Sequence, residues 1–313
     1  MTVVVFAYHD VGCAALRVLR RLGVEISMVY THHDDPHEST WFGSVRQTCT
    51  EVDLSVRIAD PRTSHEQDRI RDLAPTVIFS GYWRELLPDS VLELPSQAAV
   101  NLHGSLLPRY RGRAPVNWQI LHGEREGGVT LHHMVRRADA GDIIDQEAFP
   151  IRPDDTPTDV YARLVPAAVR VLERSALAVI EGTAPRWPQL ESKSTVFKRR
   201  RPEDGLIDFR YAAEDVRNLV RAVTKPYPGA FTYAGQHKML VWWTSHDESG
   251  RLTSAPPGTL DTEGNQVLVA CGDRRRLRLE RVQIDGREGV AADFPKLLHS
   301  GALLRPTPTR LAQ

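Results

Sequence analysis

Short apolar runs alternate with stretches of helical periodicity along the first half of the 313-residue chain. The first run, Val3-Val4-Val5-Phe6-Ala7, is apolar at every position, which is typical of a strand buried on both faces of a parallel sheet. The same kind of pattern predicts further strands at residues 25–31, 55–59, 76–80, 98–102, 129–135 and 143–149. Apolar positions at helical spacing predict intervening helices at residues 13–22, 43–50, 66–73 and 115–121. This alternation indicates an α/β domain on a mostly parallel, Rossmann-like sheet.

The second half of the chain changes pattern twice. Asp155-Thr156-Pro157 predicts the start of a long helix that ends near residue 181 and is kinked at Pro166. Three prolines and the basic run 198–201 then interrupt the pattern, which predicts a linker at residues 183–202 between a first domain at 1–182 and a second at 203–313. After a helix at 214–223, strands are predicted at 231–234, 238–243, 266–270 and 277–282. The second domain should therefore be smaller, mostly β and barrel-like.

Composition narrows the class of protein. Lys+Arg and Asp+Glu both number 40, so no overall field attracts nucleic acid or an anionic membrane. Cys13, Cys49 and Cys271 are far apart and lack a C-x-x-C spacing, which favours reduced thiols in a cytoplasmic protein. The N-terminus lacks the features of a secretory signal, and no window approaches the roughly 20 apolar residues of a membrane span.

Two cofactor classes are disfavoured by the sequence. A cluster of histidines and acids follows the second predicted strand: His32, His33, Asp34, Asp35 and His37. Its spacing matches no known zinc site, so we expect a solvated or capping loop and no metal. The turn after the first strand has the single glycine Gly12 in place of G-x-G-x-x-G, so we expect no NAD.

Polar residues with catalytic chemistry follow the strand predicted at 98–102. Asn101 and His103 stand two residues apart and should project from the same face, at the strand end where open α/β sheets bind ligands. Asp139 falls in a turn between two predicted strands. An amide that donates to a developing oxyanion contributes about 10²–10³ in rate, and a histidine that moves a proton about 10²–10⁴.

An orienting carboxylate would complete such an acyl-transfer site by stabilising the imidazolium. No serine or cysteine nucleophile is evident, which favours direct attack through a tetrahedral intermediate. From the residues alone a turn-stabilising Asn-x-His pair remains an alternative, and spacing does not connect Asp139 with His103.

The longer pattern carries a resemblance. NLHGSLLPRYRGRAPVNW, followed by GVTLHHMVRRADAGDII, resembles the folate-dependent formyltransferase family, and AVTKPYPGAFTY resembles part of its C-terminal domain. The resemblance implies a formyltransferase catalytic domain at 1–182 that takes the formyl group from 10-formyltetrahydrofolate. It implies that His103 transfers protons, Asn101 stabilises the transition state and Asp139 tunes the histidine. It also implies a set of folate contacts: Glu85, Leu86, Leu87, Arg113, Val135, Arg136, Arg137, Ala138 and Asp139.

The folate contacts also have plain structural alternatives. Backbone groups of residues 135–138 could read the pterin edge, and Leu86 and Leu87 could flank its ring. Without the resemblance, the two leucines are equally consistent with core, and Arg136-Arg137 with a solvated turn.

The acceptor amine is a separate question. Segments such as VVFAYHDVGC and FGSV are most similar to family members that formylate UDP-4-amino-4-deoxy-L-arabinose for lipid A modification and polymyxin resistance. In those proteins a decarboxylase is fused to the formyltransferase, so here we expect any decarboxylase on a separate chain. RVQIDGREGVAADFPKLLHSG is closer to the methionyl-tRNA formyltransferases.

Charge favours the UDP-aminosugar over nucleic acid. No Lys or Arg lies between Thr31 and Val45, in the loop with which tRNA-formylating members grip their substrate. The run 198–201 could hold the sugar nucleotide's diphosphate, although a solvated linker is the alternative. Three other functions stay open: methionyl-tRNA formylation, formylation of another nucleotide-linked aminosugar, and non-catalytic sugar-nucleotide binding.

Overall fold

The computed structural model describes residues 1–34, 36 and 40–308. The chain divides into two compact units. The first unit contains Met1–Val116, Glu126–Ile151 and Asp159–Arg199, and the second contains Asn117–Arg125, Arg152–Thr158 and Arg200–Gln313. The limits expected from the sequence, at residues 182 and 203, stay a prediction.

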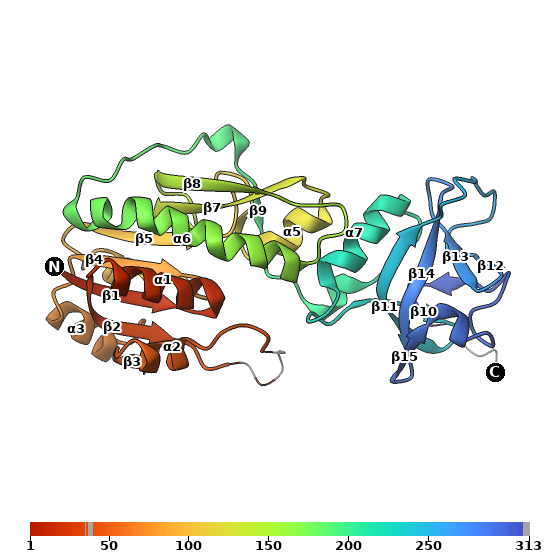
Figure 1. Ribbon diagram of the computed structural model, residues 1–313, viewed down its shortest axis with the longest axis horizontal. Helices are drawn as coiled ribbons and strands as arrows, with labels where there is room; N and C mark the ends of the chain where they lie inside the picture. Colours follow the sequence, from red (N-terminus) through yellow and green to blue (C-terminus); the bar gives the residue numbers. More distant parts are fainter. Residues whose placement is uncertain (35, 37–39, 309–313) are drawn as a thin grey trace. The chain divides into compact units, whose positions relative to one another are not determined.

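The first unit is built on a seven-stranded sheet in the order β3-β2-β1-β4-β5-β7-β8 (Figure 1). The strands are β1 (Thr2–Ala7), β2 (Glu25–Thr31), β3 (Val56–Ile58), β4 (Val77–Gly81), β5 (Ala98–His103), β7 (Glu126–His133) and β8 (Ile143–Pro150). The first five strands in this order are parallel, whereas β7 runs antiparallel to β5 and β8 antiparallel to β7. The predicted mostly parallel α/β sheet is thereby confirmed.

Within the described residues, five helices connect or flank these strands: α1 (His9–Arg21), α2 (Val45–Glu51), α3 (Ser64–Asp72), α4 (Asp89–Leu92) and α6 (Pro157–Glu181). A further helix, α5 (Pro115–Leu121), begins in the first unit and continues in the second. Helix α1 begins four residues before the prediction, because its first turn is polar and buries His9. Helix α4 is too short to show a period and was not predicted. Helix α6 continues through Pro166. In the described part of the chain, no helix combines the length and apolarity that crossing a bilayer requires.

The second unit contains α7 (Ala213–Val223) and a wholly antiparallel sheet in the order β12-β13-β14-β11-β10-β16, with β15 paired to β14. Its strands are β10 (Ala230–Ala234), β11 (His237–His246), β12 (Leu260–Glu263), β13 (Gln266–Ala270), β14 (Arg276–Ile284), β15 (Arg287–Val290) and β16 (Leu304–Arg305). A bridge between Thr259 and Leu303 joins the two ends of the strand order. Since this bridge closes the path of strands, the predicted barrel-like domain is confirmed.

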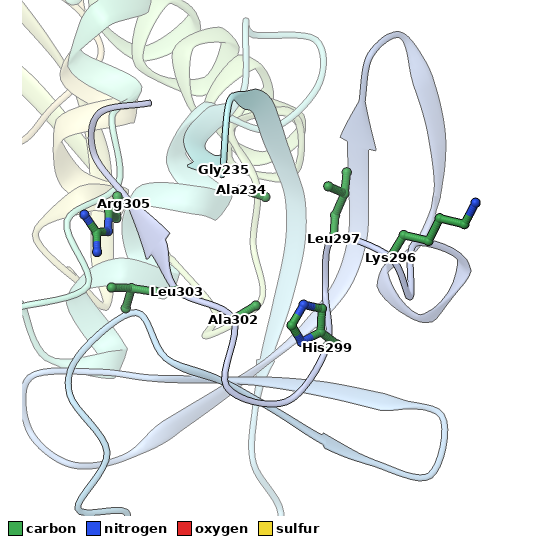
Figure 2. A pocket seen from close by; sticks show the side chains of 8 residues that line it. All are labelled: Ala234, Gly235, Lys296, Leu297, His299, Ala302, Leu303 and Arg305. Atoms are coloured by element: carbon green, nitrogen blue, oxygen red, sulfur yellow. The ribbon is translucent and has the colours of Figure 1, made fainter. Parts of the chain in front are cut away.

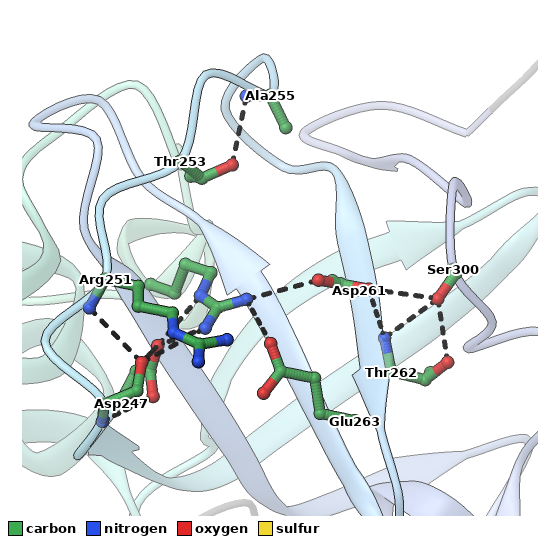
Figure 3. A network of polar contacts seen from close by, with 10 residues as sticks. Asp247, Arg251, Thr253, Ala255, Asp261, Thr262, Glu263 and Ser300 are labelled. Atoms are coloured by element: carbon green, nitrogen blue, oxygen red, sulfur yellow. Dashed lines mark hydrogen bonds and ion pairs between the residues drawn. The ribbon is translucent and has the colours of Figure 1, made fainter.

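A buried arginine links several strands of this barrel through charge-assisted hydrogen bonds. Arg276, at the start of β14, is 8% exposed and bonds Asp247 Oδ2 at 2.6 Å, Glu263 Oε1 at 2.7 Å and Asp261 Oδ2 at 3.2 Å. Figure 3 shows the three carboxylates converging from the end of β11 and from β12. Charge-assisted bonds of this kind are the strong ones in proteins, so the network stabilises the barrel.

The barrel also carries a cavity of about 310 Å³. Its lining includes the basic residues Lys296, His299 and Arg305 and the apolar Leu297 and Leu303. Figure 2 shows the side chains of Lys296 and Arg305 on opposite sides of the cavity. The two cations therefore do not converge on one point, and we assign no ligand to this cavity.

Candidate active site

Asn101 and His103 occupy the carboxyl end of β5, as the period of the strand predicts. The antiparallel register with β7 sets Asn101 opposite His132 and His103 opposite Thr130. A row of polar side chains thus crosses the sheet beside its parallel half. Strand β7 runs antiparallel to β5, and the row lies at the carboxyl ends of the parallel strands, where open α/β sheets bind ligands.

His103 is held in one orientation and one tautomer. It is 7% exposed, and its Nε2 lies 2.7 Å from the carbonyl oxygen of Tyr110. Because a carbonyl can only accept, Nε2 carries a proton and Nδ1 is the proton-accepting nitrogen of the neutral ring. Nδ1 lies 3.6 Å from Asp139 Oδ1, beyond hydrogen-bond length but within strong Coulombic range. A proton taken up at Nδ1 therefore faces a carboxylate.

Asp139 is the centre of charge in this cluster. Its backbone has φ of 52°, a left-handed turn that Asp tolerates better than most residues. Oδ2 accepts the N–H of Gly112 at 2.8 Å, and Oδ1 lies 3.5 Å from His132 Nε2. Burial would raise the pKa of Asp139, but His103 and the Gly112 N–H hold it well below its usual range. The carboxylate is therefore ionised at neutral pH.

His132 is a site residue that our reading of the sequence missed. It is 1% exposed, and its Nδ1 donates to the His133 carbonyl oxygen at 2.8 Å. Its Nε2 is then an acceptor, and it lies 3.2 Å from Asn101 Nδ2. This bond fixes the Asn101 amide and leaves its second N–H to donate elsewhere. Thr130 and His132 are two positions apart in this strand and so share one face, a signal that could have identified it.

A buried arginine braces the turn that carries Asp139. Arg111, fully buried, donates to Gln189 Oε1 at 2.8 Å and to Glu191 Oε2 at 3.0 Å. Gln189 Nε2 in turn donates to the carbonyl oxygens of Asp139 at 2.8 Å and Gly141 at 2.7 Å. Gln189 and Glu191 come from the predicted linker, so that segment supports the site.

The same segment pairs with the chain just beyond His103. Strand β9 (Val196–Phe197) runs parallel to β6 (Arg111–Gly112). The ring of Phe197 stacks on Tyr110, with centroids 5.1 Å apart. The carbonyl that holds His103 is therefore itself fixed by residues more than eighty positions later in the chain.

Replacing Arg111 by leucine should lower the free energy of unfolding by about 2–4 kcal/mol, because it removes several charge-assisted bonds and leaves the Gln189 carbonyl unpaired. Urea unfolding followed by tryptophan fluorescence measures the loss. Arg210→Leu is the matched control, since Arg210 is exposed and pairs only with the nearby Asp208 among the contacts described. It should leave the free energy of unfolding nearly unchanged, since exposed ion pairs contribute little. Equal losses in the two variants would show that Arg111 braces nothing.

Comparisons with known proteins decide the family. The model of the formyl transferase family matches residues 3–175, and that of the formyl transferase C-terminal domain matches residues 199–295. The chain belongs to the formyl transferase family. Both compact units thus contain a matched part of a formyltransferase, and the protein is an enzyme of that class.

Solved structures with a similar fold include three relevant proteins. WlaRD, a sugar 3N-formyl transferase solved in the presence of dTDP and 5-N-formyl-THF, is 18% identical over 92% of this chain and 98% of its own, with a TM-score of 0.67. The N-formyltransferase of Helicobacter canadensis, in complex with folinic acid and dTDP-3-aminofucose, is 19% identical over 88% and 98%, with a TM-score of 0.65. HypX from Aquifex aeolicus, in complex with tetrahydrofolic acid, is 17% identical over 95% and 48%, with a TM-score of 0.62.

The structure brings together three of the segments expected to contact folate in this formyltransferase. The Arg113 guanidinium donates to the carbonyl oxygen of Arg84, next to Glu85. Arg136 Nε lies 3.7 Å from a carboxylate oxygen of Asp89, the first residue of α4. The segments around residues 85, 113 and 136 therefore meet in the first unit, beyond the carboxyl end of β4.

The individual side chains in these segments differ in their surroundings. Leu86 is 66% exposed and Val135 is 44% exposed, whereas Leu87 is 8% exposed and packs in the core with Ile78 and Val91. The two leucines are thus not brought together around one ligand, because consecutive residues here point in opposite directions. The other expected contacts are placed as follows: Glu85 pairs with Arg62, Arg137 pairs with Glu191, and Ala138 is half-buried.

In the histidine-rich loop that follows β2, the side chains of His32 and Asp34 contact other residues of the protein. His32 stacks on Trp83 with centroids 3.6 Å apart, and its Nε2 accepts the backbone N–H of Arg84 at 3.1 Å. Asp34 accepts from the Tyr8 hydroxyl at 3.0 Å. Asp35 and His37 lie outside the described residues. Within the described residues, no group of three or more His, Cys, Asp or Glu side chains could hold a metal ion.

Two buried histidines and one half-buried histidine predict a loss of stability in acid. Burial lowers the pKa of His9 to about 3 and those of His32 and His133 to about 4. In the unfolded chain a histidine titrates near pH 6.5, so between about pH 6.5 and 4 the unfolded state binds more protons. The stabilisation is fully present above about pH 6.5. As the pH is lowered through this window, the free energy of unfolding should fall by up to about 1.4 kcal/mol per pH unit for each histidine.

Urea midpoints at about pH 7, 6 and 5 measure this slope. A His133→Leu variant lacks one of the three protonations and should show a shallower dependence on pH. An equal slope in both proteins would contradict the assignment of the acid sensitivity to these rings.

Proposed function

We propose that this formyltransferase moves the formyl group of 10-formyltetrahydrofolate to the amino group of a nucleotide-linked aminosugar. The observation that carries the proposal is the convergence of Asn101, His103 and Asp139 around one buried point in a chain of this family. A protein that merely bound a sugar nucleotide would gain nothing from an imidazole whose free nitrogen faces a carboxylate.

Each of the three residues has one task in the transfer. The amine nitrogen forms a bond to the formyl carbon, the bond from that carbon to the folate nitrogen breaks, and one proton passes from the amine to the leaving nitrogen. Asn101 donates its second amide N–H to the formyl oxygen, where negative charge develops. His103 takes the proton of the amine at Nδ1 and returns it to the leaving nitrogen, and Asp139 stabilises the imidazolium between the two events.

The segments around residues 85, 113 and 136 fit a folate. Leu86 and Val135 are exposed apolar side chains in segments that otherwise carry charge, which suits contact with the flat pterin ring. The backbone from 135 to 138 supplies N–H and C=O groups for its polar edge. WlaRD and the Helicobacter canadensis enzyme, which share the fold, were solved with formylated folates.

The distribution of basic residues fits a sugar nucleotide as acceptor better than a tRNA. Residues 32–44 contain no Lys or Arg, so this loop offers nothing to a polyanion. Lys198 and Arg199 directly follow β9, the strand that braces the site, and can neutralise a diphosphate. The two sugar formyltransferases of similar fold were solved with dTDP or dTDP-3-aminofucose. Among UDP-sugars, the resemblance in sequence favours UDP-4-amino-4-deoxy-L-arabinose.

The test is an acceptor panel. Purified protein and 10-formyltetrahydrofolate are mixed with UDP-linked aminosugars, dTDP-linked aminosugars or methionyl-tRNA, and release of tetrahydrofolate is followed. We expect turnover with at least one nucleotide-linked aminosugar and none with the tRNA. Turnover with methionyl-tRNA alone would replace the acceptor, and no turnover with any amine would support a non-catalytic binder.

A further inference from the structure

Five aromatic rings from separate segments meet at the carboxyl edge of the parallel sheet. Trp41, Phe42 and Tyr82 are half-buried, and they lie around His9 and Tyr161, which are buried. Ring centroids lie 4.3 Å apart for His9–Phe42, 4.7 Å for His9–Tyr161, 4.9 Å for His9–Trp41, 5.6 Å for His9–Tyr82 and 5.3 Å for Trp41–Tyr161. His9 is thus the hub of the cluster, with burial lowering its pKa and keeping it neutral.

The backbone is strained where it presents two of these rings. His9 has φ of 62° and Tyr82 has φ of 60°, although neither is glycine. Nine non-glycine residues of the described chain have positive φ, and five of them lie at or beside the site: His9, Tyr82, Tyr110, Ala114 and Asp139. Such strain is costly and gathers at ligand sites. Strain at His9 and Tyr82 therefore points to a function for the rings beyond packing.

The aromatic cluster borders the catalytic strand. A Cβ added at Gly104, the residue after His103, would lie only 2.3 Å from the Tyr82 hydroxyl oxygen. Tyr82 therefore rests directly on the backbone that follows His103. The cluster is therefore adjacent to the end of β5, where His103 would act on the reacting amine.

We propose that Trp41, Phe42 and Tyr82, here named the aromatic platform, bind the sugar ring of the acceptor. The inference rests on the proposed function, because in a nucleotide-linked aminosugar the amine that must reach His103 belongs to the sugar. The apolar C–H face of a pyranose packs on aromatic rings, and an amine in its cationic form is attracted to their faces. His9 and Tyr161 are positioning residues: both are buried, and they pack against the rings of the aromatic platform.

The platform predicts a specific pattern in the kinetics of Trp41→Leu. The KM for the nucleotide-linked aminosugar should rise about five- to tenfold, as expected for loss of one aromatic contact. The KM for 10-formyltetrahydrofolate and the inhibition constant of the matching nucleoside diphosphate, which lacks the sugar, should stay unchanged. Trp41→Phe should restore most of the affinity for the aminosugar. Trp187→Leu is the matched control, since Trp187 is 56% exposed and belongs to the same unit.

Several outcomes would overturn the inference. An unchanged KM for the aminosugar in Trp41→Leu would remove the platform from the acceptor site. A parallel rise in the inhibition constant of the nucleoside diphosphate would move the contact from the sugar to the nucleotide. A rise confined to the folate KM would assign the ring to the other substrate. If wild-type protein turned over no nucleotide-linked aminosugar, the proposed function itself would fail, and this result needs no variant to be recognised.

Discussion

His103→Ala is expected to lower kcat by about 10²–10⁴ while leaving the KM for 10-formyltetrahydrofolate nearly unchanged. The ring supplies Nδ1 as the group that moves the proton, and His132 cannot replace it, since the accepting nitrogen of His132 is bonded to Asn101. Steady-state release of tetrahydrofolate with a nucleotide-linked aminosugar measures both parameters.

A second variant separates chemistry from structure. His103→Gln keeps an N–H that can donate to the Tyr110 carbonyl oxygen but has no nitrogen able to accept a proton. It should lose as much turnover as the alanine variant. His246→Ala, at an exposed histidine on the barrel, is the control and should behave as wild type. Turnover near the wild-type rate in His103→Gln would move the proton-transfer role to another group.

Asp139→Asn should lower kcat by about 10²–10⁴ as well, because the charge beside Nδ1 disappears and the new amide can donate to that nitrogen. The pKa of Asp139 lies well below its usual range, so the carboxylate stays ionised from about pH 5 upward. The variant should therefore lose activity at every pH in that range.

Asp142→Asn provides a control from the same turn. Asp142 lies three residues further on and pairs with Arg186 at the surface. Its replacement should leave kcat within about twofold of wild type. Equal losses in the two variants would indicate that the turn is merely destabilised and that Asp139 has no electrostatic role.

Strands and long helices could be predicted from the sequence because their apolar period is unambiguous. Strand β2 coincides with its prediction at residues 25–31, and the fully buried β1 and β4 appear where the continuous apolar runs stand. The elements that were missed, such as α4, β6 and β9, have two to four residues and cannot show a period. Their positions depend on long-range pairing that a single sequence does not encode locally.

In the catalytic site, too, the local features could be predicted from the sequence and the long-range contacts could not. Strand alternation placed Asn101 and His103 on one face, but only the fold brings Asp139 to within 3.6 Å of the imidazole. The support from Gln189 and Glu191 had no local signal, since both residues lie in a proline-interrupted stretch and act on groups about fifty or more positions away. The aromatic platform escaped prediction for the same reason, because its rings come from two segments about forty positions apart.

The most direct measurement follows the formyl carbon itself. The protein is supplied with isotopically labelled 10-formyltetrahydrofolate and a nucleotide-linked aminosugar, and the product is read by NMR. Wild-type protein should place the label in a formamide on the sugar amine, while His103→Gln should leave it on the folate. Two results would contradict transfer by the Asn101–His103–Asp139 site. One is label found only in free formate, released by hydrolysis, and the other is an equal yield of labelled sugar from His103→Gln.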